Sequence, residues 1–317
     1  MRVVAAVVAY NRRDLLNECL NALQEQTLPL DAVVVVDNAS TDDSAEVAAG
    51  FPEVDLVRLG VNTGGAGGFA VAIEHALTVQ NADLVWVMDD DTIPTPTALE
   101  ALLDVRSNAR EEVSVLASRV VWADGLDHPM NTPRRKPLAR ASERRDAAAV
   151  ASVPVRSASF VSALVDAKAV RAHGLPVAEY FLWNDDFEFT ARILRHGRGL
   201  YVPASVVLHK TKARADTDVD PGPRFYYEVR NKLWLFRVST ALGWYELPLY
   251  VASTARRWMR TYRASQDRGT IVRTFRAGWN DGVKTKPRDN GAYLDSLGID
   301  GSSLTTFETA RSRGAHR

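Results

Sequence analysis

Leu84-Val85-Trp86-Val87-Met88-Asp89-Asp90-Asp91, residues 84–91, is the stretch from which the fold can be predicted. Its first five residues are apolar and bounded by polar sequence, which is typical of a strand buried on both faces of a sheet. The three carboxylates that follow repel one another unless a positive charge lies among them. Because side chains alternate along an extended chain, Asp89 and Asp91 point to the same side and can share one hard divalent cation. A solvated loop, or acids that cap the next helix, is the alternative explanation.

Three earlier segments follow the same plan, an apolar strand that ends in polar residues. Strands are predicted at 3–9, 33–36 and 54–59, each followed by a helix-forming stretch. Strands that alternate with helices indicate a parallel sheet with helices on both faces, and right-handed crossovers place the four carboxyl ends along one edge. Ligands bind along that edge in open sheets. The polar clusters expected there are Asn11-Arg12, Asp37-Asn38, residues 62–68 and residues 89–91.

A glycine-rich loop follows the third predicted strand, with the sequence Asn62-Thr63-Gly64-Gly65-Ala66-Gly67-Gly68. It has neither the G-x-G-x-x-G spacing of dinucleotide-binding proteins nor the Lys-Ser/Thr pair of a P-loop. Its glycines allow the backbone to approach a ligand closely, and the positive end of the following helix favours an anion. A tight turn with close helix packing explains the same glycines equally well.

A second acidic cluster follows bulky aromatic residues in the segment 180–192, Tyr-Phe-Leu-Trp-Asn-Asp-Asp-Phe-Glu-Phe-Thr-Ala-Arg. Aromatic surroundings lower the local dielectric and raise a carboxylate pKa towards the range useful to a general base, so Asp186 is the predicted base. The alternative is a helix N-terminus that favours acids, with Glu188 paired to Arg192 one turn later. The two explanations can hold for different residues of the cluster.

His209 ends another predicted strand, 201–208, and is followed by Lys210-Thr211-Lys212. At a strand end, this imidazole can serve as a third metal ligand, contact a phosphate or be purely structural. Residues 123–151, between the two acidic clusters, are polar and rich in Pro and Arg. We expect this stretch to be an excursion or a mobile loop rather than a core element.

The bulk composition is that of a globular protein, with 317 residues, 46% of them hydrophobic and 25% charged. This length fits one large α/β domain with an appendage, or two small domains. Residues 1–191 hold 16 Lys and Arg against 28 Asp and Glu, a net charge of −12, and residues 192–317 hold 23 against 11, a net charge of +12. An acidic front suits a cation site, and a basic rear suits a phosphate-bearing or membrane partner. Mutual complementation of the two halves is an equally good explanation.

Cys19 is the single cysteine, so no disulfide can form within the chain, which fits a reducing compartment. Met1 leads directly into strand-like sequence, so we expect no signal peptide. The longest apolar region, 233–252, is interrupted by charged residues and a proline. Because it contains no run of about 18 uncharged apolar residues, we expect no membrane span.

From Arg224 onward, aromatic residues alternate with Arg and Lys in a pattern of two or three amphipathic helices broken near Gly243 and Pro248. Aromatic and cationic side chains together suit a membrane interface. Helices that pack on the catalytic domain and expose a basic face are the alternative. We therefore divide the chain into a catalytic domain, 1–223, and a basic, aromatic helical region, 224–317. The part beyond Lys286 is rich in Gly, Ser and Arg and is expected to be partly mobile.

In this order, the motifs resemble the inverting family-two glycosyltransferases of GT-A fold, over about residues 3–240. The matching motifs are Ala9-Tyr10-Asn11-Arg12, Val36-Asp37-Asn38-Ala39-Ser40-Thr41-Asp42, the Asp-x-Asp at 89–91, Asp185-Asp186-x-Glu188 with Arg192, and Phe225-Tyr226-Tyr227-x-x-Arg230-Asn231. Within the family, the glycine loop, the three aspartates and Trp183-x-Asp-Asp are most similar to galactofuranosyltransferases of mycobacterial-type galactan synthesis. The short chain resembles the initiating enzyme of that pathway.

The resemblance implies a donor, an acceptor and a metal. The donor would be UDP-galactofuranose, and the acceptor a polyprenyl-diphosphate-linked rhamnosyl-N-acetylglucosamine at the start of cell-wall galactan (arabinogalactan) synthesis. Mn²⁺ or Mg²⁺ would be held by Asp89, Asp91 and His209. The other implied roles are donor binding by Arg12, Asp37, Asn38, Asn62, Gly65 and Asp90, acceptor binding by Trp183, catalysis by Asp186, and orientation of that base by Asp185 and Glu188.

Two features depart from the family pattern. The usual Thr of the first strand is replaced by Ala9 or Tyr10, and the Gln-x-x-Arg-Trp signature of processive synthases is absent, which argues against long-polymer synthesis. Rhamnosyltransferases that act on dTDP-rhamnose share most of the remaining motifs and are the main alternative. A nucleotidyltransferase would need a basic triphosphate loop, for which Arg12-Arg13 is a poor substitute. An intact Asp186 argues against a non-catalytic sugar-nucleotide binder at the membrane.

A lipid-linked acceptor implies a cytoplasmic protein that is peripheral on the inner face of the plasma membrane. The expected partners are the UDP-sugar, the lipid-linked glycan and the membrane surface, without nucleic acid. The one protein partner expected is a second copy of the chain, in a homo-oligomer.

Overall fold

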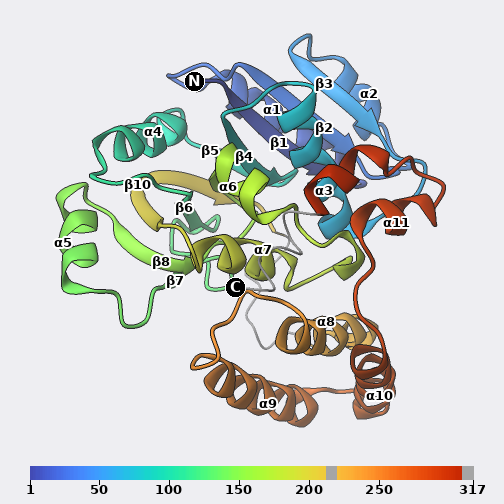
Figure 1. Cartoon of the computed structure of the whole chain (residues 1–317). Helices are drawn as coiled ribbons and strands as arrows, with labels where there is room; N and C mark the ends of the chain where they lie inside the picture. The colour runs from blue at the N-terminus through green and yellow to red at the C-terminus, as the bar shows by residue number, and fades with distance from the viewer. Residues whose placement is uncertain (212–219, 309–317) are drawn as a thin grey trace.

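The computed structural model describes residues 1–211 and 220–308 and contains one mixed sheet flanked by helices, with a helical lobe beside it (Figure 1). The first part of the chain alternates strands and helices as the sequence predicts. Its elements are β1 (Val3–Ala9), α1 (Arg13–Gln24), β2 (Ala32–Asp37), α2 (Ser44–Ala49), β3 (Val54–Arg58), α3 (Gly64–Thr78), β4 (Leu84–Asp89), β5 (Thr92–Pro94) and α4 (Ala98–Asn108).

The middle of the chain adds strands to the sheet, and the last third is helical. The middle elements are β6 (Val115–Val121), β7 (Arg134–Arg135), α5 (Ala141–Ala149), β8 (Val153–Ser157), β9 (Ala163–Asp166), α6 (Ala167–His173), η1 (Ala178–Tyr180), α7 (Asp185–Leu194) and β10 (Gly199–His209). The last elements are η2 (Gly222–Arg224), α8 (Phe225–Arg237), α9 (Leu247–Ala264), α10 (Arg268–Lys284), α11 (Asn290–Asp295) and η3 (Ser302–Leu304). The 123–151 stretch is irregular over much of its length, but the expectation that it holds no core element is wrong, because β7 joins the sheet edge and Ala147 of α5 packs in the core.

The sheet has the strand order β3-β2-β1-β4-β9-β6-β10-β8-β7, and β5 pairs with β10. Strands β3, β2, β1 and β4 are parallel, as predicted. Strand β9 is antiparallel to both β4 and β6, so β6 and β10 run in the same direction as β4. The predicted fold, a mostly parallel mixed sheet with helices on both faces and a helical extension, is therefore confirmed.

Strand β1 shows why the sheet is covered on both faces. Every residue from Val3 to Ala9 is buried, and alternate side chains belong to different cores. Val4, Ala6 and Val8 pack with α3 and α7, whereas the residues between them pack with α1 and α4. Burial of a strand on both faces favours a continuous run of apolar residues, which is what the sequence contains.

The helical lobe is built on close packing of α10 against α8. A Cβ added at Gly278 would lie 2.6 Å from the carbonyl oxygen of Tyr226, and one added at Gly282 would lie 2.7 Å from Cβ of Leu233. These glycines allow the two helices to approach closely. Helix α9 is different, because Thr254 is the one buried residue among its 18.

The chain then returns from the lobe to the sheet domain. Tyr293, Leu294, Leu304 and Phe307 belong to the core that α3 covers (Figure 1). The expectation of a partly mobile tail after Lys286 is therefore wrong for α11 and η3, while residues 309–317 of that tail lie outside the described residues. Within residues 1–211 and 220–308, no helix is both long and apolar enough to cross a bilayer.

Candidate functional site

The carboxyl ends of the parallel strands meet at one rim of the sheet, where the predicted site residues lie. Strand register places Val8 beside Asp89, and Ala9 beside Asp37. The segment 89–91 therefore lies beside the turn that follows β1. The backbone N–H of Tyr10 donates to Oδ2 of Asp90 over 2.9 Å.

Arg12 provides the positive charge among the aspartates. One guanidinium nitrogen lies 3.0 Å from Oδ1 of Asp90 and 2.5 Å from Oδ2 of Asp91. Half of the Arg12 side chain remains exposed at the rim, 47% by area. The predicted donor residues Arg12 and Asp90 therefore form an ion pair with each other. A phosphate at the rim would contact the exposed part of Arg12.

Strand pairing brings His209 to the same cluster. Strands β5 and β10 are antiparallel, with His209 opposite Thr92, directly after Asp91. The Nε2 atom of His209 lies 3.1 Å from Oδ1 of Asp91, and its Nδ1 lies 3.1 Å from Oδ1 of Asn131. A hydrogen bond from Nδ1 to the Asn131 oxygen leaves Nε2 as the nitrogen that can bind a metal.

The cluster carries more negative charge than its surroundings stabilise. Burial, with the charge of Asp91, raises the pKa of Asp89 to about 7. Burial also raises the pKa of Asp90 to about 6 against the opposing charge of Arg12. Burial alone would raise the pKa of Asp91 too, but contacts with His209 and the charge of Arg12 lower it. A divalent cation among these groups would favour their ionised forms.

The residues fit a metal ion. Asp89, Asp91 and His209 each offer a ligand atom, and these atoms all lie within 4.8 Å of one another. The buried Oδ1 of Asp91 accepts no well-directed hydrogen bond, so it has a lone pair available. Two carboxylates and an imidazole are a donor set compatible with Mn²⁺ and Mg²⁺.

Hydrogen-bonded side chains connect this cluster to the second acidic cluster. Asn131 accepts from His209 with its oxygen and donates to the Ser159 hydroxyl over 3.1 Å with its amide nitrogen. Ser159 is in turn hydrogen-bonded to Asp186. Asp186 therefore lies on the same side of the molecule as Asp91 and His209, as a base that faces the metal site requires.

Asp185 and Asp186 begin α7 in different surroundings. Asp185 is buried, and burial with the charge of Asp186 raises its pKa well above the usual value. The charge of Asp89 adds to that shift. Asp186 is half-buried and thus more exposed than Asp185. Its partial burial raises its pKa, and the charges of Arg134 and Lys232 and the hydrogen bond with Ser159 oppose this rise. A carboxyl held neutral cannot accept a proton, so Asp186 is the better candidate for a base.

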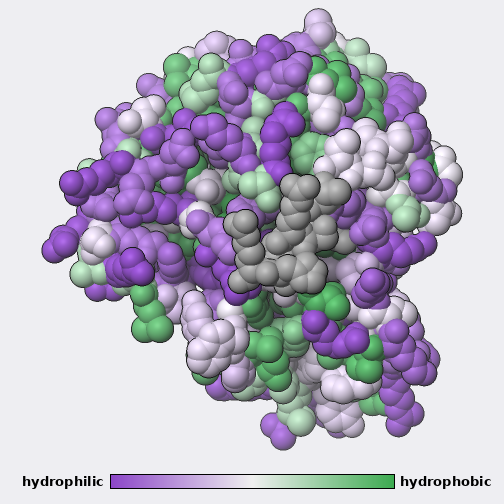
Figure 2. Space-filling view, viewed as in Figure 1, coloured by the Kyte–Doolittle hydropathy of each residue, from purple (hydrophilic) through white to green (hydrophobic). Residues whose placement is uncertain are grey.

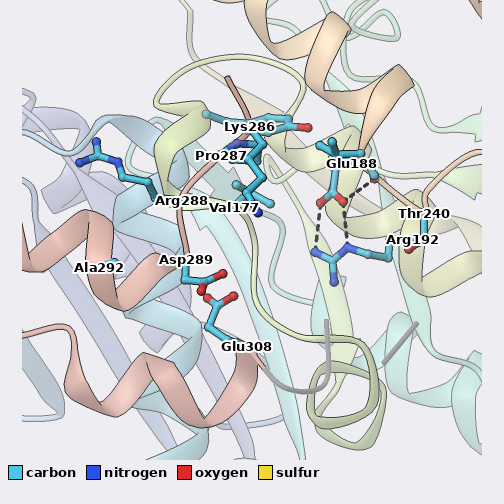
Figure 3. A pocket seen from close by; sticks show the side chains of 13 residues that line it. Val177, Glu188, Arg192, Thr240, Lys286, Pro287, Arg288, Asp289, Ala292 and Glu308 are labelled. Carbon is cyan, nitrogen blue, oxygen red and sulfur yellow. Dashed lines mark hydrogen bonds and ion pairs between the residues drawn. The ribbon is translucent and has the colours of Figure 1, made fainter. Parts of the chain in front are cut away.

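Glu188 lies on another side of α7. Its carboxylate forms a two-point ion pair with Arg192, at 2.9 and 3.0 Å, and accepts a hydrogen bond from Ser239 at 2.7 Å. This confirms the i+4 pairing predicted as the alternative and argues against the role of orienting Asp186. The pair lines a cavity of about 430 Å³ that faces Lys286 and Arg288 (Figure 3), and neither Asp186 nor the metal cluster lines this cavity.

The loop before α7 is held by the helix after β10. Phe181, Trp183 and Asn184 have positive φ angles of 63°, 65° and 67°, which are unfavourable for such residues. The amide of Asn231 donates to three carbonyls of this loop, those of Tyr180, Leu182 and Trp183, each over 2.9 Å. Asn231 thus fixes the half-buried Trp183 close to the candidate base.

The glycine loop is shaped largely by packing. Asn38 binds Thr63 and the Gly64 carbonyl with both ends of its amide, and Asn62 accepts from Gly64. Asn38 is buried, and these contacts shape the loop, while its predicted contact with the donor stays a prediction. Asp37 accepts from the N–H of Ser40 over 3.3 Å and is also buried.

Gly65 is the glycine of this loop that faces open space. A Cβ at Gly64, Gly67 or Gly68 would lie 2.0 to 2.5 Å from Phe181, Thr63 or Val8, whereas one at Gly65 would meet nothing within 4 Å. This open cradle at the start of α3 fits close approach of a donor phosphate or sugar to the backbone.

The substitution Gly65→Ala is therefore expected to weaken UDP-sugar binding about tenfold while leaving the melting temperature within a few degrees. Isothermal titration and thermal unfolding measure the two effects. Gly68→Ala, which would clash with Val8, is the matched control and is expected to lower stability instead. Unchanged donor affinity in Gly65→Ala would remove Gly65 from the donor site.

Three residues of the site were not predicted from the sequence. Asn131 and Ser159 link His209 to Asp186, and the ring of His128 lies 5.0 Å from that of His209. All three come from the 123–162 part of the chain, which has no local pattern that points to this rim. His128 is buried, and that is not visible in its polar sequence surroundings.

Comparisons with known proteins identify related sequences and folds. The model of the family described as "Glycosyl transferase family 2" matches residues 5–162. Galactofuranosyltransferase GlfT1 of Mycobacterium tuberculosis (strain ATCC 25618 / H37Rv) is 36% identical over 204 residues, which are 62% of this chain and 65% of GlfT1. The match thus spans slightly less than two thirds of this relative.

Solved structures show the same fold at low sequence identity. S. aureus TarS 1-349 superimposes with a TM-score of 0.59 at 16% identity, over 98% of this chain and 90% of that chain. A mannosyltransferase, PcManGT from Pyrobaculum calidifontis in complex with GDP-Man and Mn²⁺, has a TM-score of 0.53 at 19% identity, over 99% of this chain and 83% of that chain. These likenesses establish the GT-A fold.

Proposed function

This chain carries a glycosyl transferase family 2 domain, and we propose that it is a metal-dependent, inverting galactofuranosyltransferase. The donor is UDP-galactofuranose and the acceptor is a polyprenyl-diphosphate-linked rhamnosyl-N-acetylglucosamine in cell-wall galactan initiation. One observation carries this proposal: the Asp89, Asp91 and His209 cluster is joined by hydrogen-bonded side chains to Asp186. The similarity to GlfT1 supports the choice of sugar.

Asp89, Asp91 and His209 would hold Mn²⁺ or Mg²⁺. The ion supplies positive charge that stabilises the leaving diphosphate. Arg12, at the exposed edge of the cluster, adds a second positive charge on the donor side. Asn62 accepts from the N–H of Gly64, and Gly65 faces open space at the start of α3, whose positive end favours a phosphate.

Asp186 takes the proton from the acceptor hydroxyl. The hydroxyl oxygen forms a bond to the anomeric carbon while the bond from that carbon to UDP breaks, and UDP leaves with the bonding electrons. Attack from the side opposite the leaving group inverts the anomeric centre. Trp183 provides an apolar face for the acceptor sugar, and Asp185, next to Asp186 at the start of α7, orients the base.

Helix α9 is the surface proposed to contact the membrane. Its exposed residues form an apolar stripe that runs beside a stripe of arginines. The apolar stripe is Val251, Ala252, Ala255, Met259 and Tyr262, and the arginines are Arg256, Arg260 and Arg263. Figure 2 shows hydrophobic residues gathered on the lobe formed by α8, α9 and α10. Arg257 is not part of this surface, because it pairs with Glu228.

Reversing the three surface arginines to Glu should reduce flotation with vesicles that contain anionic lipid by about tenfold or more, since each cation near such a surface contributes about 1 kcal/mol. The matched control reverses Arg135, Arg140 and Arg145 on the 123–151 excursion and should float normally. Equal flotation of both triple variants would show that α9 is an ordinary solvated helix.

The donor is tested by product mass. The protein is incubated with a synthetic lipid-diphosphate disaccharide, Mn²⁺ and either UDP-galactofuranose or dTDP-rhamnose. A product heavier by one or a few hexose units with the UDP-sugar alone supports the proposal. A deoxyhexose product with dTDP-rhamnose would assign the chain to the rhamnosyltransferases instead.

A further inference from the structure

Lys232 on α8 is a buried cation that packs on the Phe187 ring. Lys232 as a residue is 4% exposed, and its ammonium group makes no hydrogen bond or ion pair within the described part of the chain. The nearest acid on its own helix is Glu228, one turn earlier. That carboxylate is taken by Arg257, Trp258 and Asn184. Burial lowers the pKa of Lys232 to about 8, although the charges of Glu228 and Asp186 act in the opposite direction.

A second unpaired cation lies beside it. The side chain of Arg134, on the short strand β7, forms no hydrogen bond or ion pair among the described residues. The guanidinium carbon of Arg134 and the Nζ of Lys232 each lie 5.1 Å from the centre of the Phe187 ring. The two charges repel each other, which contributes to the low pKa of Lys232. Lys232 and Arg134 are far apart in the sequence but lie against the same ring. Two neighbouring cations of this kind can bind one anion.

This cation pair lies next to the proposed base. Phe187 directly follows Asp186, and both Lys232 and Arg134 act electrostatically on Asp186, yet neither forms an ion pair with it. The donor phosphates belong at the other cluster, where Asp89, Asp91 and His209 lie. An anion beside Phe187 would therefore arrive with the acceptor.

We propose that Lys232 and Arg134 form a subsite for the diphosphate of the acceptor. The inference rests on the proposed function, because only a lipid-diphosphate acceptor brings that group to the Asp186 side. The planar Arg134 head can bind two phosphate oxygens, and Lys232 provides a compact charge at the same ring. A bound diphosphate would supply the hydrogen-bond acceptors that Lys232 lacks.

The test compares two acceptors that share the same disaccharide, one on a short prenyl diphosphate and one on a neutral alkyl glycoside. Lys232→Met and Arg134→Gln should each raise KM for the diphosphate acceptor about tenfold or more and change KM for the neutral acceptor less than about twofold. Arg135→Gln, the adjacent exposed arginine, is the control. A loss of kcat shared by both acceptors reports an effect on Asp186 and not on the subsite. Equal changes in KM for both acceptors would overturn the proposal.

A binding measurement separates this inference from the proposed function. Inorganic pyrophosphate is titrated calorimetrically into the whole protein with EDTA present, and Lys232→Met should weaken its binding about tenfold. If wild-type protein transfers sugar but Lys232→Met binds pyrophosphate normally, the subsite is wrong and the function stands. If neither acceptor is used by any variant while pyrophosphate binding still depends on Lys232, the subsite stands and the function is wrong.

Vesicles distinguish the two possible sources of the phosphate group. Binding to phosphatidylglycerol vesicles should be the same for wild type and Lys232→Met, since the residue is buried on the Asp186 side. A parallel loss of vesicle binding would assign the cation pair to a lipid headgroup and overturn the acceptor assignment. Arg134→Gln, an exposed substitution, repeats each measurement independently of any folding defect in Lys232→Met.

Discussion

Asp186→Asn should transfer sugar on the order of a thousandfold more slowly than the wild type while binding UDP with nearly unchanged affinity. Asparagine keeps the shape of aspartate but cannot take the proton from the acceptor hydroxyl. The donor site should be intact, because Ser159 and Asn131 stand between Asp186 and His209 in the hydrogen-bonded chain. Initial rates with saturating donor and calorimetric UDP titration measure the two quantities.

Asp185→Asn is the matched variant. Burial and the charge of Asp186 raise the pKa of Asp185 well above its usual value, so a neutral amide resembles its native state. A loss of about tenfold or less is expected. If Asp185→Asn is inactive and Asp186→Asn keeps near-normal turnover, the roles of the two acids are reversed.

The pH profile gives an independent readout of the base. Burial raises the pKa of Asp186, and the base acts only when it is deprotonated. Activity should therefore fall as the pH drops through this raised pKa, at a higher pH than for an exposed aspartate. The same acidic limb should be missing from the residual activity of Asp186→Asn.

Asp91→Ala and His209→Ala should each weaken UDP binding in Mn²⁺ about a hundredfold and bring it close to the affinity measured in EDTA. The variants remove one of the three ligand atoms that cluster within 4.8 Å. Calorimetry with and without Mn²⁺ measures the change, and metal titration of the free protein gives a second readout. His196→Ala, at an exposed histidine that stacks on His173, is the control.

Two results of the same calorimetric titrations would contradict the metal assignment. If wild-type UDP affinity is the same in Mn²⁺ and in EDTA, or if both variants retain the metal dependence, the metal assignment is wrong. In that case Arg12, which already contacts Asp90 and Asp91, would be the cation of the donor site.

The sheet and its functional rim were predictable because the signal is local. Apolar runs such as Val3–Ala9 and Leu84–Met88 are buried on both faces, and polar residues follow each run directly. Strand direction then brings those polar residues together without any knowledge of long-range contacts. For the same reason Asp89 and Asp91 could be predicted as a pair.

The rest of the site depends on contacts between distant parts of the chain. His209 meets Asp91 because β5 and β10 are antiparallel in one particular register, which no local pattern encodes. Asn131 and Lys232 reach the site from an irregular excursion and from the helical lobe. Glu188 shows the reverse case, since its i+4 spacing to Arg192 was visible in the sequence and decided its structural role.

The return of the chain to α3 after the helical lobe means that the catalytic unit is discontinuous in the sequence. Leu294, Leu304 and Phe307 fill the same core as Ile73 and Leu77 of α3. Cleavage after residue 223 would therefore take away part of the interior as well as the lobe, and would leave an apolar helix face in water. The helices α8 to α10 are in this sense an insertion, and exchanging them between related enzymes would require splicing at two points.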